Sequence, residues 1–96
     1  MNEIEILEIG EKCRAQMARL LNKKVESIVS LTKEEKGWKA LIEVLERKAV
    51  PDTHDLLGRY EVTMDSNGNI LRYNQTLIRY RSDRLGIEFK EAEAKE

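Results

Sequence analysis

The strongest constraint on the fold comes from residues 58–84, where two strand-like stretches flank the sequence DSNGN. Tyr60, Val62 and Met64 alternate with polar residues, as expected for one face of a pleated strand. The Asn-Gly pair in DSNGN supplies the positive φ angles that a tight reversal needs. This segment therefore predicts a β-hairpin whose loop is residues 66–69.

The register of this hairpin follows from its apolar residues. If Met64 faces Leu71 and Val62 faces Tyr73, one face of the hairpin is apolar on both strands. Beyond Tyr73 the alternation changes phase, and one β-bulge near residues 74–75 would restore it. The inner face would then continue through Thr76, Ile78 and Tyr80. In the same register three arginines point outward: Arg72, Arg79 and Arg81.

Residues 3–22 predict an amphipathic helix ahead of the sheet. They contain no proline, and their apolar residues recur at spacings of three and four: Ile6, Ile9, Cys13, Met17 and Leu20. No second cysteine or neighbouring histidine accompanies Cys13. Its thiol is therefore predicted to be a small buried hydrophobe and not a reactive or disulfide-bonded group.

Two further strands are predicted at residues 27–32 and 38–46, joined by the polar turn KEEKG. In the second of them one face is wholly apolar: Trp38, Ala40, Ile42 and Val44. The other face is mixed: Lys39, Leu41, Glu43 and Leu45. Leu41 and Leu45 would be only partly covered there, either by a neighbouring segment or by a partner.

The stretch between residues 49 and 58 links two strands without belonging to either. Pro51 keeps the preceding residue out of helical geometry. After it, Asp52 or Thr53 would cap a short helical turn over residues 54–57.

At 96 residues the chain has room for one domain with a modest core. We predict a single α+β domain over residues 1–86. In it the N-terminal amphipathic helix packs on an antiparallel sheet of about four strands, ordered as a meander. Residues 87–96 are highly charged and carry few apolar side chains, so they are predicted to form a frayed or disordered C-terminal tail.

The charge balance indicates a soluble chain. With 17 basic and 18 acidic residues, neither a strongly cationic nucleic-acid binder nor an acidic disordered chain is implied overall. No stretch is long and apolar enough to cross a membrane, and the glutamates among the first ten residues do not fit a secretory signal. Together with the lone thiol, these features predict a cytoplasmic protein.

Two groups of residues resemble metal sites and are interpreted otherwise. Residues 65–69 match the D-x-N-x-N opening of a calcium-binding loop, but the glycine and glutamate required later in that loop are missing. A turn explains this segment better. Asp52 and Asp55 flank the only histidine, His54, with no further histidine or cysteine to complete a site. No metal or other cofactor is expected.

No catalytic residues are predicted. Glu43, Glu46 and Glu61 could supply an acid and a base, but they occupy outward strand positions. There, glutamate is usually a solvated partner for arginine on the next strand. The sequence contains no phosphate-binding loop and no nucleophile with a base beside it. An enzymatic function is therefore not expected.

The segment RYNQTLIRYRSDR carries the remaining functional signal. Arginines interleaved with aromatic residues on a sheet are typical of single-stranded nucleic-acid binders, in which bases stack on the rings. Here the register turns both tyrosines inward, and nearby carboxylates lower the local potential. These residues favour cross-strand ion pairs and docking of a protein partner, with nucleic-acid binding as the alternative. The candidate partner-binding residues are Arg72, Arg79, Arg81, Leu41 and Leu45.

Several short motifs follow one another along the sequence. They are the tryptophan that opens residues 38–46, P-D-T at residues 51–53, Y-E-V and D-x-x-G within residues 60–68, R-Y at residues 72–73 and R-Y-R at residues 79–81. In their order and spacing they resemble the gas vesicle protein GvpO family. The resemblance covers roughly residues 20–84.

The resemblance implies a small cytoplasmic accessory protein required for gas vesicle formation and distinct from the shell subunit. Gas vesicles are the protein-shelled flotation organelles of some bacteria and archaea. The implied partners are other gas vesicle accessory proteins and the shell subunit, with no membrane and no catalytic residues. The protein would reside in the cytoplasm, either free or on the vesicle. The alternative is a nucleic-acid-binding regulator of gas vesicle gene expression.

Overall fold

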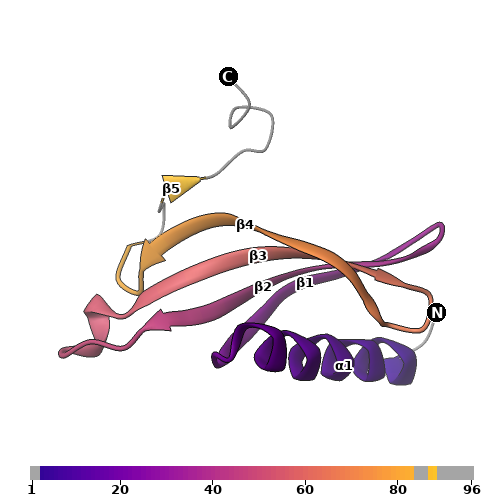
Figure 1. The fold of residues 1–96 in the computed structure, drawn as a ribbon, viewed down its shortest axis with the longest axis horizontal. Coiled ribbons are helices and arrows are strands. Elements are labelled where there is room, and N and C mark those ends of the chain that lie inside the picture. The colour runs from indigo at the N-terminus through magenta and orange to yellow at the C-terminus, as the bar shows by residue number, and fades with distance from the viewer. Residues whose placement is uncertain (1–2, 84–86, 89–96) are drawn as a thin grey trace.

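The computed structural model describes residues 3–83 and 87–88 (Figure 1). One helix, α1 (Glu3–Leu21), precedes an antiparallel sheet whose strands lie side by side in chain order. The strands are β1 (Val25–Glu34), β2 (Gly37–Arg47), β3 (Leu56–Asp65), β4 (Ile70–Tyr80) and the two-residue β5 (Ile87–Glu88); a 3₁₀ helix, η1 (Asp52–His54), lies between β2 and β3. The predicted α+β fold, a helix on a meander of four long strands, is confirmed.

The predicted division at residue 86 stays a prediction. Ile87 and Glu88 pair with β4 as β5, opposite Ile78 and Leu77. The rest of the predicted tail, residues 89–96, lies outside the described residues.

α1 lies on one face of the sheet and packs beside β1 (Figure 1). It ends where Asn22 takes a left-handed backbone conformation with φ of 56°, which asparagine tolerates better than most residues. The backbone N–H of Lys23 then donates to the carbonyl of Ala18 and closes the helix end. The chain can therefore enter β1 at once, and helix and sheet share one core.

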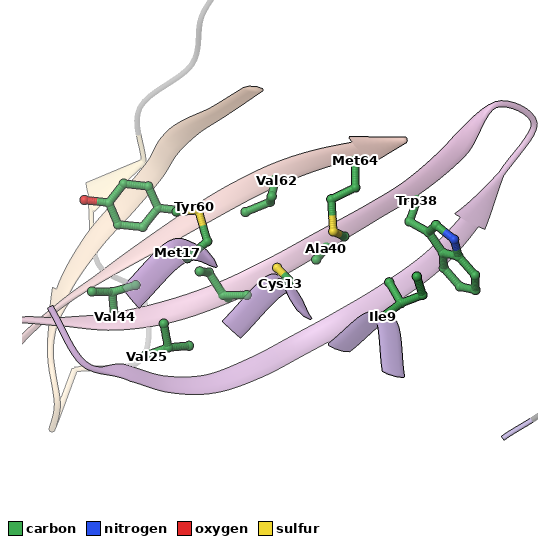
Figure 2. Packing of buried hydrophobic residues seen from close by; sticks show 11 residues of the cluster. Ile9, Cys13, Met17, Val25, Trp38, Ala40, Val44, Tyr60, Val62 and Met64 are labelled. Carbon is green, nitrogen blue, oxygen red and sulfur yellow. The ribbon is translucent and has the colours of Figure 1, made fainter. Parts of the chain in front are cut away.

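The core lies between α1 and the facing side of the sheet, which we call the helix side. Figure 2 shows the side chains of α1 and of the strands meeting there. The buried cluster consists of Ile9, Cys13, Met17, Val25, Trp38, Ala40, Ile42, Val44, Tyr60, Val62 and Met64. The predicted inner faces of β2 and β3 are therefore confirmed.

The single thiol belongs to this core. Cys13 has no exposed surface and forms no disulfide. Burial raises the pKa of the Cys13 thiol to about 11, so little reactive thiolate exists near neutral pH. The prediction of a small buried hydrophobe is confirmed.

The apolar stripe of α1 differs from the prediction at its end. Leu20 was expected to face the core, but its side chain is 56% exposed, and Leu21 packs against the core instead. Each member of the buried row follows the previous one by four residues, and Leu21 continues that row from Met17. Leu20, three residues after Met17, is turned toward solvent.

The hairpin between β3 and β4 forms as predicted, with a loop organised by Asp65. The Asp65 Oδ1 atom accepts the backbone N–H groups of Asn67 and Asn69, each at 2.9 Å. Gly68 takes φ of 88°, which glycine adopts without strain. The interpretation of this segment as a turn is confirmed.

Side chains of α1 hold this loop against the helix. Lys12 Nζ donates to the carbonyl of Asn67 at 2.7 Å. Gln16 donates to the carbonyl of Gly68 at 2.7 Å and accepts the backbone N–H of Ile70 at 3.1 Å. The tip of the hairpin is therefore held in place by hydrogen bonds from α1.

The predicted register is right for one of its two pairs. Val62 faces Tyr73, but Met64 faces Ile70, and Leu71 is an extra residue in β4. The prediction that Leu71 faces Met64 is therefore wrong, and the Leu71 side chain is exposed. The loop closes one residue earlier than predicted, around a glycine with positive φ, and this shifts the pairing.

A second bulge in β4 lies within one residue of the predicted place. Gln75 and Leu77 face consecutive residues of β3, so Thr76 is the extra residue. Beyond it Ile78 and Tyr80 return to the helix side, as predicted. Tyr80 stays 48% exposed there, because α1 lies beside β1, at the other edge of the four-strand meander.

The link between β2 and β3 is less helical than predicted. In this link only η1 is helical. Of the predicted turn at residues 54–57, the first residue ends η1 and the last two begin β3. The cap residue is Pro51, with no side-chain hydrogen bond, so the predicted capping is wrong. The carboxylate of Asp55 accepts the backbone N–H of Ala49 at 2.8 Å instead, and this contact holds the link together.

A candidate protein-binding face of the sheet

The face of the sheet opposite α1, which we call the charged face, carries the residues predicted to bind a partner. Its side chains come from alternate residues of β2, β3 and β4, and the pairing sets them in rows across the strands. The rows are Lys39 with Thr63 and Arg72; Leu41 with Glu61 and Asn74; Glu43 with Arg59 and Leu77; and Leu45 with Leu57 and Arg79. Four of the five predicted residues therefore share this face.

Glu43 stands at the centre of the charged face. It is only 5% exposed, so the prediction of a solvated glutamate is wrong. Arg79 binds both carboxylate oxygens through Nε and Nη2, each at 2.8 Å. Arg59, its neighbour on β3, donates from Nη2 at 3.1 Å, which confirms the predicted cross-strand ion pair.

Two arginines compensate for the burial of Glu43. The hydrogen bond from Arg79 is the main cause that holds the pKa of the Glu43 carboxyl below its ordinary value, against the opposing effect of burial. Leu57 and Leu77 are buried on the same face. They lie in the same row as Glu43 and in the next one, where a lower local dielectric strengthens the attraction between the charges but also raises the cost of burying them.

Arg79 uses all three nitrogens of its guanidinium group within the chain. Besides binding Glu43, its Nη1 donates to the backbone carbonyls of Arg81 at 3.1 Å and Asp83 at 3.0 Å. The side chain therefore ties the turn after β4 to the centre of β2. Arg79 points outward as predicted, but it shapes the face and has few donors left for a partner.

A second carboxylate, Asp55, holds Arg81 at the end of the charged face. Asp55 is fully buried, and its Oδ2 accepts from Arg81 Nε at 3.1 Å and from Nη2 at 3.0 Å. The backbone hydrogen bond from Ala49 is the main cause of the lowered pKa of Asp55. Arg81 Nη2 also lies 3.3 Å from Glu26 Oε2, so this group of charges reaches β1.

The predicted partner-binding residues therefore divide into two groups. Arg79 and Arg81 are bound to buried carboxylates, in line with the predicted ion pairs of these arginines. Arg72 is exposed, whereas Leu41 and Leu45 are half-buried as predicted. Contact with a partner stays a prediction for all five.

Sequence reasoning missed the roles of Asp55 and Glu26. Asp55 was read as part of an exposed link, yet it lies beside the end of β4, where the backbone N–H of Arg81 donates to its carbonyl at 2.8 Å. The two residues are 26 positions apart in the chain. No local pattern marks such a pair, because the contact exists only once β3 and β4 are aligned.

Glu46, another predicted outward glutamate, lies on the helix side. The alternation of β2 sets it there, two residues after the buried Val44, so the outward assignment is wrong. Glu46 is also the extra residue of a bulge at the end of β2. Its carboxylate accepts from the Tyr60 hydroxyl at 2.6 Å and from Gln75 Nε2 at 3.2 Å, and it pairs with Lys23. Burial and the hydrogen bond to Glu46 raise the pKa of Tyr60.

The chemistry of the charged face suits binding better than proton transfer. A carboxylate with a lowered pKa is a weak base, so Glu43 and Asp55 are poor general bases. Within residues 3–83 and 87–88, no group of three or more histidine, cysteine, aspartate or glutamate residues is arranged to hold a metal ion. No helix in this part of the chain is long and apolar enough to cross a membrane.

Fold and face together define the class: a small α+β protein with one helix on a meander sheet, whose opposite face is shaped by arginine–carboxylate contacts. The chain belongs to the family described as gas vesicle synthesis protein GvpO, whose model matches residues 1–85. The resemblance seen in the sequence motifs is thereby confirmed.

Curated relatives carry the same family name. The chain is 36% identical over 80 residues to gas vesicle protein O1 of Halobacterium salinarum, a match that covers 83% of this chain and 66% of that protein. It is 39% identical over 71 residues to gas vesicle protein O of Haloferax mediterranei, with 73% and 50% covered. For gas vesicle protein O of a Streptomyces species the identity is 43% over 72 residues, with 73% and 56% covered.

The chain therefore spans between half and two-thirds of the length of these relatives. No solved structure matches it.

Proposed function

We propose that this chain is an accessory protein of gas vesicle formation that acts in the cytoplasm by binding other gas vesicle proteins. Membership of the GvpO family, described as gas vesicle synthesis proteins, supports the process. The charged face supports the mode of action, which is binding without a catalysed reaction. The partner would be another accessory protein or the shell subunit. In the second case, binding would keep the shell subunit soluble until it is added to the vesicle.

This proposal rests on a surface that combines apolar and charged residues and whose strands are held in place by ion pairs. Leu41 and Leu45 leave apolar area on the charged face, and Arg72 lies one row away from Leu41. Between the two leucines, Glu43 and its arginines fix the spacing of the strands. A surface that is already ordered loses little conformational entropy when a partner binds.

The residues have different roles in this proposal. Arg72, Leu41 and Leu45 contact the partner. Arg79 and Arg81 position the surface, because their guanidinium groups are already bound to Glu43 and Asp55.

The contacts do not favour the alternative, a nucleic-acid-binding regulator. Phosphate recognition needs cationic groups that are free to bind. On the charged face Arg59, Arg79 and Arg81 are each paired with a carboxylate.

The test replaces contact residues and leaves the ion pairs intact. A chain with both Arg72→Gln and Leu41→Ser should accumulate normally in cells, because neither side chain is fully buried, and few or no gas vesicles should form. The matched control changes Arg19→Gln and Leu20→Ser, an exposed arginine and leucine of α1, and should leave vesicles unchanged. Chain amount is measured by immunoblot and vesicle yield by electron microscopy. Normal vesicles with the first variant would remove Arg72 and Leu41 from the site.

A further inference from the structure

The outer edge of β4 is only partly paired. On its inner side β4 pairs with β3 along most of its length, whereas on its outer side, among the described residues, β5 pairs with Leu77 and Ile78 alone. Figure 1 shows β5 beside the end of β4. From Ile70 to Thr76, the N–H and C=O groups that point away from β3 have no strand partner in the part of the chain that the structure describes. An edge of this kind can take up a further strand.

The helix side of β4 also carries aromatic surface that α1 does not cover. Tyr73 is 39% exposed, although its ring meets that of Tyr60 edge-on, with the ring centres 6.2 Å apart. The helix α1 packs beside β1, at the other edge of the four-strand meander. A further apolar side chain at the outer edge of β4 could therefore cover the exposed side of Tyr73.

The register of β5 directs the chain along this edge. β5 is antiparallel to β4 and sets Ile87 opposite Ile78, so a continued strand would run back toward Ile70. Opposite residues of an antiparallel pair occupy the same face, which places position 87 on the helix side. Positions two apart in a strand share a face, so position 89 belongs to the helix side as well.

The sequence after β5 favours a short continuation. Position 89 is a phenylalanine, which favours strands, and it is the one large apolar residue among residues 88–96. Residues 90–96 read KEAEAKE, and all three of these residue types are depleted in strands. Charged side chains also protect a sheet edge from further pairing. The strand should therefore end soon after Phe89.

We propose that residues 89 and 90, which lie outside the described residues, continue β5 along β4 and that Phe89 covers the exposed side of the Tyr73 ring. With Thr76 left out of the pairing on this side, as it is toward β3, Gln75 lies opposite position 89. Tyr73 is then its diagonal neighbour, a place that an aromatic ring can reach.

The C-terminal segment thereby becomes an intramolecular strap on the edge of β4, where composition alone predicted a frayed tail. The strap closes part of an edge that would otherwise be open to association with other strands. It rests on the pairing of β4 with β5 and is independent of the proposed function.

A strand from another molecule fits this edge less well. It would have to displace β5 from Leu77 and Ile78 before it could run along the whole of β4. The attached segment binds within its own chain, so it has a high effective concentration that a separate strand lacks. This favours the segment of the same chain over a partner or a second copy.

The experiment uses the isotope-labelled full chain and NMR. Cross-relaxation between ring protons of Phe89 and Tyr73 should be visible, because the two rings are in contact. Among residues 74–76, the amide hydrogens that point away from β3 should exchange slowly with solvent, because they pair with the continued strand. Neither result should depend on the concentration of the chain.

Phe89→Ser is the diagnostic variant and Ala94→Ser its matched control, since both place a serine where the C-terminal segment has an apolar residue. Phe89→Ser should speed amide exchange at residues 74–76 about tenfold and shift the ring resonances of Tyr73. Ala94→Ser should do neither. Unchanged resonances of the buried residues Trp38 and Ile42 would show that each variant is folded.

The proposal is overturned if the rings of Phe89 and Tyr73 show no contact, if the two serine variants exchange equally, or if residues 89–96 give the chemical shifts of an unstructured chain. Protection at residues 74–76 that rises with chain concentration would assign the edge to a second copy and would also overturn the strap.

Discussion

The two faces of the sheet bury their residues in different ways. On the helix side α1 covers alternating apolar residues, and Trp38, Ala40, Ile42 and Val44 are at most 1% exposed. On the charged face the most buried polar groups are the carboxylates of Glu43 and Asp55, each held by arginine. The residues of the helix side are buried because α1 packs on them. The carboxylates of the charged face are buried among ion pairs that join its strands.

This difference predicts different sensitivities to mutation. Apolar packing on the helix side supplies most of the folding free energy, because stabilisation scales with the apolar area removed from water. A buried ion pair adds little net stability, yet removing one partner leaves an uncompensated charge. The charged face should therefore be less important for stability in total but sensitive to single changes that break a pair.

The largest effect should come from Trp38→Ala on the helix side. The indole is almost completely buried, so the cavity should lower the free energy of unfolding by about 3–5 kcal/mol. Urea unfolding followed by circular dichroism measures this. A loss below about 1 kcal/mol would mean that Trp38 contributes no more than an exposed residue does.

The next effect tests the charged face with Arg79→Gln. It removes the two-point contact to buried Glu43, so the free energy of unfolding should fall by about 2–3 kcal/mol. Arg72→Gln on the same strand is the control and should change it by less than about 0.5 kcal/mol, because Arg72 is exposed. Equal effects of the two variants would show that the Glu43 contacts do not stabilise this face.

A smaller effect is expected where the hairpin meets the helix side. In Gly68→Val the new Cβ would lie 2.9 Å from the Ile9 side chain at a backbone φ of 88°, so the loss should exceed about 1 kcal/mol. Asn69→Ala should be milder, since it removes one exposed side-chain hydrogen bond to Asp65. A stable Gly68→Val chain would show that the loop can change its conformation.

The smallest expected effect is a fall in the free energy of unfolding at acid pH, which arises from the carboxylates of the charged face. The pKa of Glu43 is lowered in the folded chain, so its contribution is fully present above the ordinary pKa of 4.5 and is lost as the pH falls through the lower folded value. Urea midpoints should therefore fall in this acid range, and less steeply for Glu43→Gln. Asp65 in the hairpin loop also has a lowered pKa, so Asp65→Asn should reduce the slope by its own share and serves to compare a carboxylate outside the charged face. An unchanged slope in Glu43→Gln would contradict the assignment.

Patterns within single elements predicted most of the fold. Apolar spacings of three and four residues predicted the helix α1, and strict alternation predicted the inner faces of β2 and β3. Where the pattern had two continuations, as at Leu20 and Leu71, the prediction was wrong. At Leu71 a one-residue change in loop closure moved the pairing, and local spacing does not encode that change. At Leu20 the row with four-residue spacing continued to Leu21 instead.

The sequence by itself determined the helix, the strands and which side of them is apolar, because these depend on the period of the backbone. Only the tertiary structure decided that Glu43 is buried and that Arg79 and Arg81 are bound to carboxylates. Those contacts join β2 to β4 and the end of β4 to the link before β3. The residues involved are distant in the chain, and their energies depend on burial, which is established only when the sheet and its turns have come together.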